Sequence, residues 1–150
     1  MKKLAKLILG LGVLALLGFA AWVRLVPSDP AVWHVDPATV TDRGARNSYL
    51  LAAGGDAEPL EVPLPPDQAA ARLDAVALAT PRTTRLAGQG DFVTYLTRSA
   101  AMGFPDYTSV RILPTATGSQ VLIFARSRFG ESDFGVNRDR VEDWVARLTR

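Results

Sequence analysis

Arginine and aromatic residues alternate along two segments in the C-terminal half of this 150-residue chain. Side chains two positions apart in a strand point to the same side of a sheet, so one sheet face would carry Arg98, Tyr107, Arg111, Phe124, Arg126 and Arg128. Guanidinium groups over an aromatic floor can hold a carboxylate or a phosphate through paired hydrogen bonds. The alternation therefore indicates a site for an anionic small molecule or a lipid headgroup, or an interface for an envelope protein. A solvated sheet face with arginine stems covering apolar side chains has the same pattern.

The segment from Gly130 to Arg140 joins the last predicted strand to the last predicted helix. Its glycines can supply positive φ angles, while Asp133 and Asn137 can satisfy free backbone N–H groups, with Asn137 as the N-cap. In a functional alternative, Asp133 pairs with Arg126, Arg128 or Arg138 and shapes the ligand site. Both roles remain open at this point.

Residues that could support catalysis are few. Asp106, which follows Pro105, is expected in a turn; with Asp133 it could otherwise serve as the general acid or base of a hydrolase or lyase. The only histidine, His34, lies soon after the apolar N-terminal run, which does not favour a Ser-His-Asp triad. The absence of cysteine excludes disulfides and thiolate chemistry, and the acids match no metal-binding loop. We therefore expect no catalytic residue, metal or cofactor.

Positive charge is concentrated at the N-terminus. Lys2, Lys3, Lys6 and Arg24 give the first 26 residues a charge of +4, and the remaining 13 arginines face 15 acidic residues, which leaves −2 for the rest. A nucleic-acid-binding domain needs a basic surface. We therefore expect no nucleic-acid partner.

The N-terminal segment is long and apolar. Residues 7–23 carry no charge and would span about 26 Å as a helix, or about 34 Å if extended to residues 4–26, against a hydrocarbon core of about 30 Å. More lysines precede the run than arginines follow it, which predicts a cytoplasmic N-terminus and a periplasmic C-terminal domain on a single-pass inner-membrane protein. A cleaved signal peptide, with Gly18 and Ala20 before the cut, is the alternative.

Periodicity divides the remainder into two parts. Prolines predict an extended juxtamembrane linker over residues 27–47 that lies along the domain, followed by an α+β domain over 48–150. The domain is predicted as a two-layer sandwich, with an antiparallel meander of about four strands covered on one face by two helices. The helices are expected at 66–76 and 137–149, the strands at 82–87, 92–99, 107–114 and 120–128, and a short further strand at 48–52. A four-residue hairpin loop would place Thr108, Val110 and Ile112 opposite Ala125, Ile123 and Val121.

From Tyr95 onward the chain resembles the family called domain of unknown function 1499 (DUF1499). The likeness rests on Tyr95-x-Thr97-Arg98-Ser99 and on a second motif, Gly103-Phe104-Pro105-Asp106. A longer string carries most of it: Ser127-Arg128-x-Gly130-x-Ser132-Asp133-x-Gly135-x-Asn137-Arg138-x-Arg140-Val141. The resemblance implies a single-domain, often membrane-anchored protein with no established activity.

Three hypotheses follow. The first is a non-enzymatic, membrane-tethered envelope protein that binds an anionic small molecule, a lipid headgroup or an envelope partner through the arginine-bearing sheet face. The second is the hydrolase or lyase using Asp106 or Asp133. The third is a structural subunit of a membrane complex.

Overall fold

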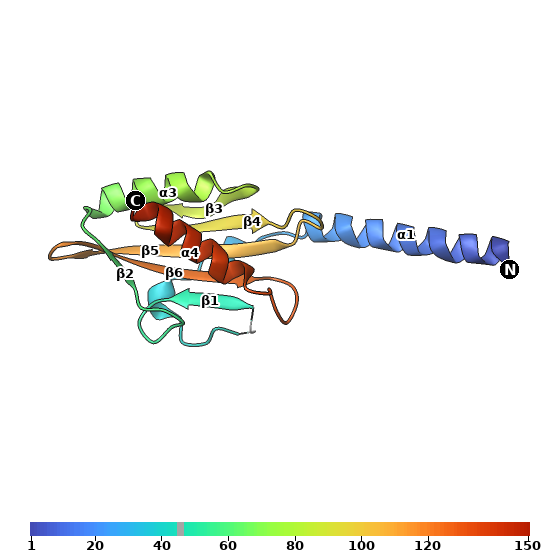
Figure 1. Ribbon diagram of the computed structural model, residues 1–150, viewed down its shortest axis with the longest axis horizontal. Coiled ribbons are helices and arrows are strands. Elements are labelled where there is room, and N and C mark those ends of the chain that lie inside the picture. Colours follow the sequence, from blue (N-terminus) through green and yellow to red (C-terminus); the bar gives the residue numbers. More distant parts are fainter. Residues whose placement is uncertain (45–46) are drawn as a thin grey trace.

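The computed structural model of the protein describes residues 1–44 and 47–150. Helix α1 (Lys2–Leu25) projects away from the rest of the molecule as a single rod (Figure 1). Its 24 residues correspond to about 36 Å, and its most apolar window has a mean hydropathy of 2.2 with no residue buried. The helix is therefore long and apolar enough to cross a membrane, although a signal sequence has the same properties.

The described residues form one antiparallel sheet of six strands in the order β1-β6-β5-β4-β3, with β2 also paired to β6. The strands are β1 (Ser48–Leu51), β2 (Leu60–Val62), β3 (Thr83–Gln89), β4 (Phe92–Arg98), β5 (Pro105–Thr115) and β6 (Gly118–Ser127). The meander β3 to β6 was predicted, but an estimate of about four strands was too low. The edge strand β2 was missed because it is three residues long and flanked by prolines, a pattern that also indicates a loop.

The pairing of β5 with β6 matches the predicted register. Thr108 lies opposite Ala125, Val110 opposite Ile123, and Ile112 opposite Val121. The side chains of Val110, Ile112 and their partners belong to the main hydrophobic core. Alternation of apolar and polar residues therefore identified the face that the helices cover.

Helices α3 (Pro66–Leu78) and α4 (Val136–Leu148) lie together on this face (Figure 1). Trp144 of α4 is fully buried, its ring meets that of Tyr95 edge-on at 5.5 Å, and its Nε1 donates to Thr80 Oγ1 at 2.9 Å. Leu73 of α3 joins the same core. The two predicted helices are confirmed, with ends that differ by one or two residues.

The other face of the sheet is covered by residues 27–44, here called the strap. We expected this segment to be extended, but it contains the short helix α2 (Pro30–Trp33) and the 3₁₀ turn η1 (Pro37–Thr39). Asp29 and Asp36 each cap one of these turns by accepting a backbone N–H two residues later. A capping Asp followed by Pro at the first helical position favours a helix start, so Asp-Pro here initiates a turn.

Candidate functional site

The strap lies directly on the arginine-bearing face of the sheet. The Trp33 ring stacks on Tyr107 at 3.9 Å, and Ser28 Oγ lies 2.8 Å from the Tyr107 hydroxyl. Tyr107 is consequently fully buried. The predicted face is thus an internal surface between β-sheet and strap, and only its margins reach solvent.

Arg126 is the most enclosed cation of this face, with 9 % of its surface exposed. Its Nη2 donates to the Trp33 carbonyl at 2.8 Å, and its guanidinium lies over the Phe124 ring at 4.6 Å and the Trp33 ring at 5.2 Å. Within the described ranges, its Nη1 has no hydrogen-bond partner and no acid pairs with it. Burial lowers the pKa of Arg126 to about 10, because the charged form loses hydration.

A cavity of about 380 Å³ lies between the strap and β6. Val32, Val35 and Val40 line it from the strap, and Phe124 and Arg126 line it from the strand. The strap also contributes Thr39, Thr41, Asp42, Arg43 and Gly44 to the lining, so the walls are partly polar. Of the two cations that line the cavity, Arg43 pairs with Asp56 and Arg126 has no described counterion.

The remaining arginines of the face are engaged at its margins. Arg111 pairs with Asp36 of the strap at 3.7 Å and with Asp91 at 3.3 Å. Arg128 Nη1 donates to the Pro27 carbonyl at 2.6 Å, and its guanidinium contacts the Trp33 ring. These contacts hold the strap down at both ends of the site.

Three of the predicted ligand residues lie elsewhere. Arg98 Nη1 donates to the Gly103 carbonyl at 2.9 Å, beside the end of α1. Arg138 pairs with Glu142 on α4 at 2.9 Å, on the helical side of the sheet. Asp133 accepts from the backbone N–H groups of Gly135 and Asn137. The period of two therefore holds along β4, β5 and β6, because Val93 and Tyr95 point into the core and Arg98 follows the alternate positions. Arg98 ends its strand beside α1, away from the cavity, and Asp133 and Arg138 lie outside the strands.

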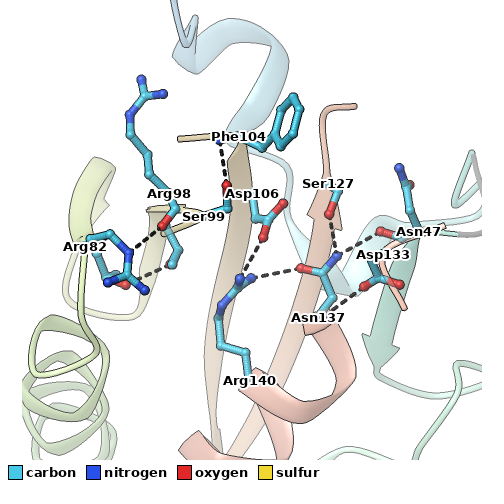
Figure 2. A network of polar contacts seen from close by, with 12 residues as sticks. Asn47, Arg82, Arg98, Ser99, Phe104, Asp106, Ser127, Asp133, Asn137 and Arg140 are labelled. Atoms are coloured by element: carbon cyan, nitrogen blue, oxygen red, sulfur yellow. Dashed lines mark hydrogen bonds and ion pairs between the residues drawn. The ribbon is translucent and has the colours of Figure 1, made fainter. Parts of the chain in front are cut away.

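The motif residues near the end of β6 form a polar network (Figure 2). Arg140 Nη2 lies 2.7 Å from Asp106 Oδ2, with these side chains 8 % and 10 % exposed, and its Nη1 donates to Asn137 Oδ1. Asn137 Nδ2 in turn donates to the Asn47 carbonyl and lies 3.0 Å from Ser127 Oγ. The network ties α4, β5, β6 and the chain before β1 together. The expectation that Asp106 lies in a turn was wrong, because this residue is paired within β5 and its carboxylate is the ion-pair partner of Arg140.

The expectation that Asn137 caps α4 was wrong. Gly135, in the left-handed region at φ 86°, occupies the N-cap position, and α4 begins at Val136. The Asn137 side chain instead spans the interior to Asn47 and Ser127. The capping role belongs to Asp133, whose Oδ2 accepts the Asn137 N–H at 2.8 Å. The sequence alone allows Asn137 to be either a helix cap or an interior hydrogen-bonding residue. Its complete burial shows that it has the interior role.

The family model for protein of unknown function DUF1499 matches residues 29–148. The chain belongs to the DUF1499 family. The match begins at Asp29, so the strap from α2 onward is included in the DUF1499 region. A crystal structure of protein MLL2253 from Mesorhizobium loti is similar with a TM-score of 0.44 and 12 % identity, over 67 % of this chain and 96 % of that chain. No curated protein matches this DUF1499 chain.

His34 is a packing residue of the strap that sequence reasoning did not assign to the sheet face in this DUF1499 protein. Its Nδ1 lies 2.8 Å from Thr94 Oγ1, and its ring stacks on Phe92 at 3.8 Å. Trp33 was missed as a site residue in the same way. A detectable signal was present, because Asp29-Pro30 starts the helical turn that ends with Trp33 and His34.

Acidification should weaken docking of the strap through His34. Burial lowers the pKa of His34 from its ordinary value of 6.5, against a smaller opposing effect of Asp36. The unfolded chain therefore binds the proton more readily than the folded chain, so the free energy of unfolding falls as pH drops below about 6.5 and levels off below the folded pKa.

The measurement compares the wild type with His34→Asn in thermal unfolding from pH 8 to pH 5. The wild type should lose more stability over this interval, because the carboxylates that also titrate are common to both proteins. Parallel pH profiles would contradict the assignment to His34.

Proposed function

We propose that this DUF1499 protein is a membrane-tethered binding protein that takes up an anionic group attached to an apolar body in the cavity beside Arg126. A medium-chain carboxylate is the simplest molecule of this class. The valines and Phe124 that line the cavity suit the apolar body, and the guanidinium suits the anion.

The observation that carries the proposal is the unneutralised charge of Arg126. Moving a cation out of water costs several kcal/mol unless an anion and further hydrogen bonds compensate for it. In the described part of the chain, Arg126 receives one carbonyl acceptor and two ring contacts, and its Nη1 is left without an acceptor. A bound carboxylate or phosphate would supply the missing acceptor and charge.

Access to Arg126 requires a local movement of the strap. Nη1 is shielded from solvent, and the Trp33 carbonyl occupies Nη2. An entering anion would compete with this carbonyl for the guanidinium. The strap is suited to such exchange because Val32 is already exposed and the cavity extends beneath it.

Binding is favoured over catalysis by the state of the two candidate acids. Asp106 is paired with Arg140 in the interior, and Asp133 is held by two backbone N–H groups of the α4 start. Neither carboxylate is available as a proton carrier without breaking a structural contact.

The membrane tether in this proposal is α1. Lys2, Lys3 and Lys6 precede its apolar run, and Arg24 lies in its last turn. This asymmetry supports a cytoplasmic N-terminus and a periplasmic domain on an inner-membrane protein. The protein would then bind its ligand in the periplasm.

Arg126→Met tests the site directly. We expect octanoate to bind the variant about 10- to 100-fold more weakly than the wild type, because a hydrogen bond to a charged group contributes about 1.5 to 3 kcal/mol. Isothermal titration calorimetry of full-length protein in nanodiscs measures this difference, and partition of octanoate into the lipid cancels between the two proteins.

The stability of Arg126→Met separates a ligand site from a purely structural arginine. We expect its free energy of unfolding to change by no more than about 1 kcal/mol, because loss of the Trp33 contacts is offset by removal of a buried charge. Arg138→Met, on the helical side of the sheet and ion-paired to Glu142, is the matched control and should retain octanoate binding. Equal octanoate affinity of wild type and Arg126→Met would reject the site.

A further inference from the structure

A second cavity lies at the junction of α1 with the domain and is surrounded by arginines. Its volume is about 460 Å³, and Arg24 of α1, Arg82 and Arg98 line it together with Ser99 and Gly103. This cavity is distinct from the one beside Arg126, with which it shares no lining residue.

The three guanidinium groups contact carbonyl oxygens. Arg24 donates to Ala20 and Ala101, Arg98 to Gly103 and more distantly to Val23, and Arg82 Nε to the Arg98 carbonyl at 3.0 Å. Among residues 1–44 and 47–150, no acid forms an ion pair with any of them. A local charge of +3 is therefore not neutralised by the described chain, although residues 27–150 carry −2 in sum.

The backbone around the cavity is constrained. Arg82 has a positive φ of 59°, which is rarely adopted by a residue with a long side chain and marks local strain. Two hydrogen bonds hold it there, Nε to the Arg98 carbonyl and the Arg98 N–H to the Arg82 carbonyl, both at 3.0 Å. Figure 2 shows the Arg82 side chain turned toward the Arg98 backbone, with the Arg98 guanidinium directed away from the Asp106 network.

The position of the cavity along α1 corresponds to the surface of a bilayer. Arg24 directly follows the uncharged run of residues 7–23, where a cation is expected at the headgroup level. Phe19 and Trp22, inside that run, contact Phe104 at 6.2 Å and Phe129 at 5.5 Å between ring centroids. If α1 crosses the membrane, the uncharged loop of residues 99–104 therefore lies within the interfacial layer.

We propose that this cavity binds the phosphate of a bilayer phospholipid, with Arg24, Arg82 and Arg98 as its ligands. The positive charge of the cavity favours an anion, because guanidinium groups bind phosphate oxygens through charge-assisted hydrogen bonds. The cavity adjoins the membrane helix, so the phosphate is expected to belong to a lipid. Acyl chains of the same lipid would lie along Phe19, Trp22 and Phe104.

Native mass spectrometry of the full-length protein in mild detergent tests the proposal with dioleoylphosphatidylglycerol as the probe. The wild type should retain this lipid, and the triple variant Arg24→Gln/Arg82→Gln/Arg98→Gln should retain at least about 10-fold less, because several charged hydrogen bonds are lost. The matched control Arg72→Gln/Arg147→Gln/Arg150→Gln removes the same charge far from α1 and should retain the lipid as the wild type does.

Two further arms identify the source of the phosphate. Dioleoylglycerol, which has the same chains without phosphate, should not be retained, and inorganic phosphate at 10 mM should not displace the phospholipid. Equal retention of dioleoylglycerol, full displacement by inorganic phosphate, or equal retention by the triple variant and the wild type would each overturn the proposal.

A labelling experiment covers the case in which the triple variant does not fold. The natural chain has no cysteine, so Ala101→Cys and Thr117→Cys can each carry a single environment-sensitive fluorophore in nanodiscs. Lipid with a spin label near the headgroup should quench the fluorophore at position 101 and leave that at 117, in the distant β5–β6 turn, unchanged. Equal fluorescence behaviour at the two positions would overturn the proposal. Octanoate binding at Arg126 is independent of all these outcomes.

Discussion

Replacing Asp106 by alanine should lower the free energy of unfolding by about 3 to 5 kcal/mol. Asp106 Oδ2 lies 2.7 Å from Arg140 Nη2, and both side chains are almost completely withdrawn from solvent. Without the carboxylate, Arg140 would remain as a buried cation that still donates to Asn137. The loss is large because the desolvation of the Arg140 guanidinium would no longer be compensated by a carboxylate.

Urea unfolding of full-length protein in nanodiscs measures this loss, and the double variant Asp106→Leu/Arg140→Met shows its origin. Removing both charges should restore most of the stability, because an apolar pair often replaces a buried ion pair at little cost. Glu142→Ala breaks the exposed pair with Arg138 and should cost less than about 1 kcal/mol. A double variant as unstable as Asp106→Ala would contradict this explanation.

Trp144→Ala should have an effect of similar size, about 3 to 5 kcal/mol. The indole is fully buried between α4 and the sheet, where it packs edge-on against Tyr95. Truncation leaves a cavity at the centre of the core and removes the hydrogen bond from Nε1 to Thr80. Neighbouring side chains can fill this space only in part, since the helices are fixed by their other contacts.

Trp144→Phe is the matched control, because it keeps most of the ring volume and removes the Nε1 donor. Its cost should be close to that of one buried hydrogen bond with some loss of packing, about 1 to 2 kcal/mol. Both variants can be followed by urea unfolding with far-ultraviolet circular dichroism as the signal. Equal losses in the two variants would show that the hydrogen bond, and not the ring volume, dominates.

The elements that carry regular periodicity could be predicted from the sequence. The position of the hairpin turn together with the alternation gave the register of β5 and β6, although residues 116–117 alone connect the strands where a four-residue loop was expected. The stripe of Val141, Trp144 and Leu148 was sufficient for α4. Both depend on local repeats, since strand and helix periods are set by backbone geometry. The family assignment also followed from residues, namely the string from Ser127 to Val141.

The strap could not be placed by the same reasoning. Its turns have a local signal in Asp29-Pro30 and Asp36-Pro37, but the sheet face on which they rest is more than sixty positions away in the chain, as the contact of Trp33 with Tyr107 illustrates. The spacing of residues along the chain gives no information about a contact over this distance. The segment was expected to lie along the domain, but the sequence did not indicate that Trp33 would cover the arginine-bearing face of β5 and β6.

The attachment of the strap to α1 leaves little slack in the chain. Residues 26–29 alone separate the end of α1 from the start of α2. Within that interval the Pro27 carbonyl accepts a hydrogen bond from Arg128. Lifting Trp33 off the sheet would therefore strain this short connection and favour a change in the angle between α1 and the domain. In the membrane-tethered protein that we propose, a ligand beneath the strap would therefore change the inclination of the domain relative to the bilayer.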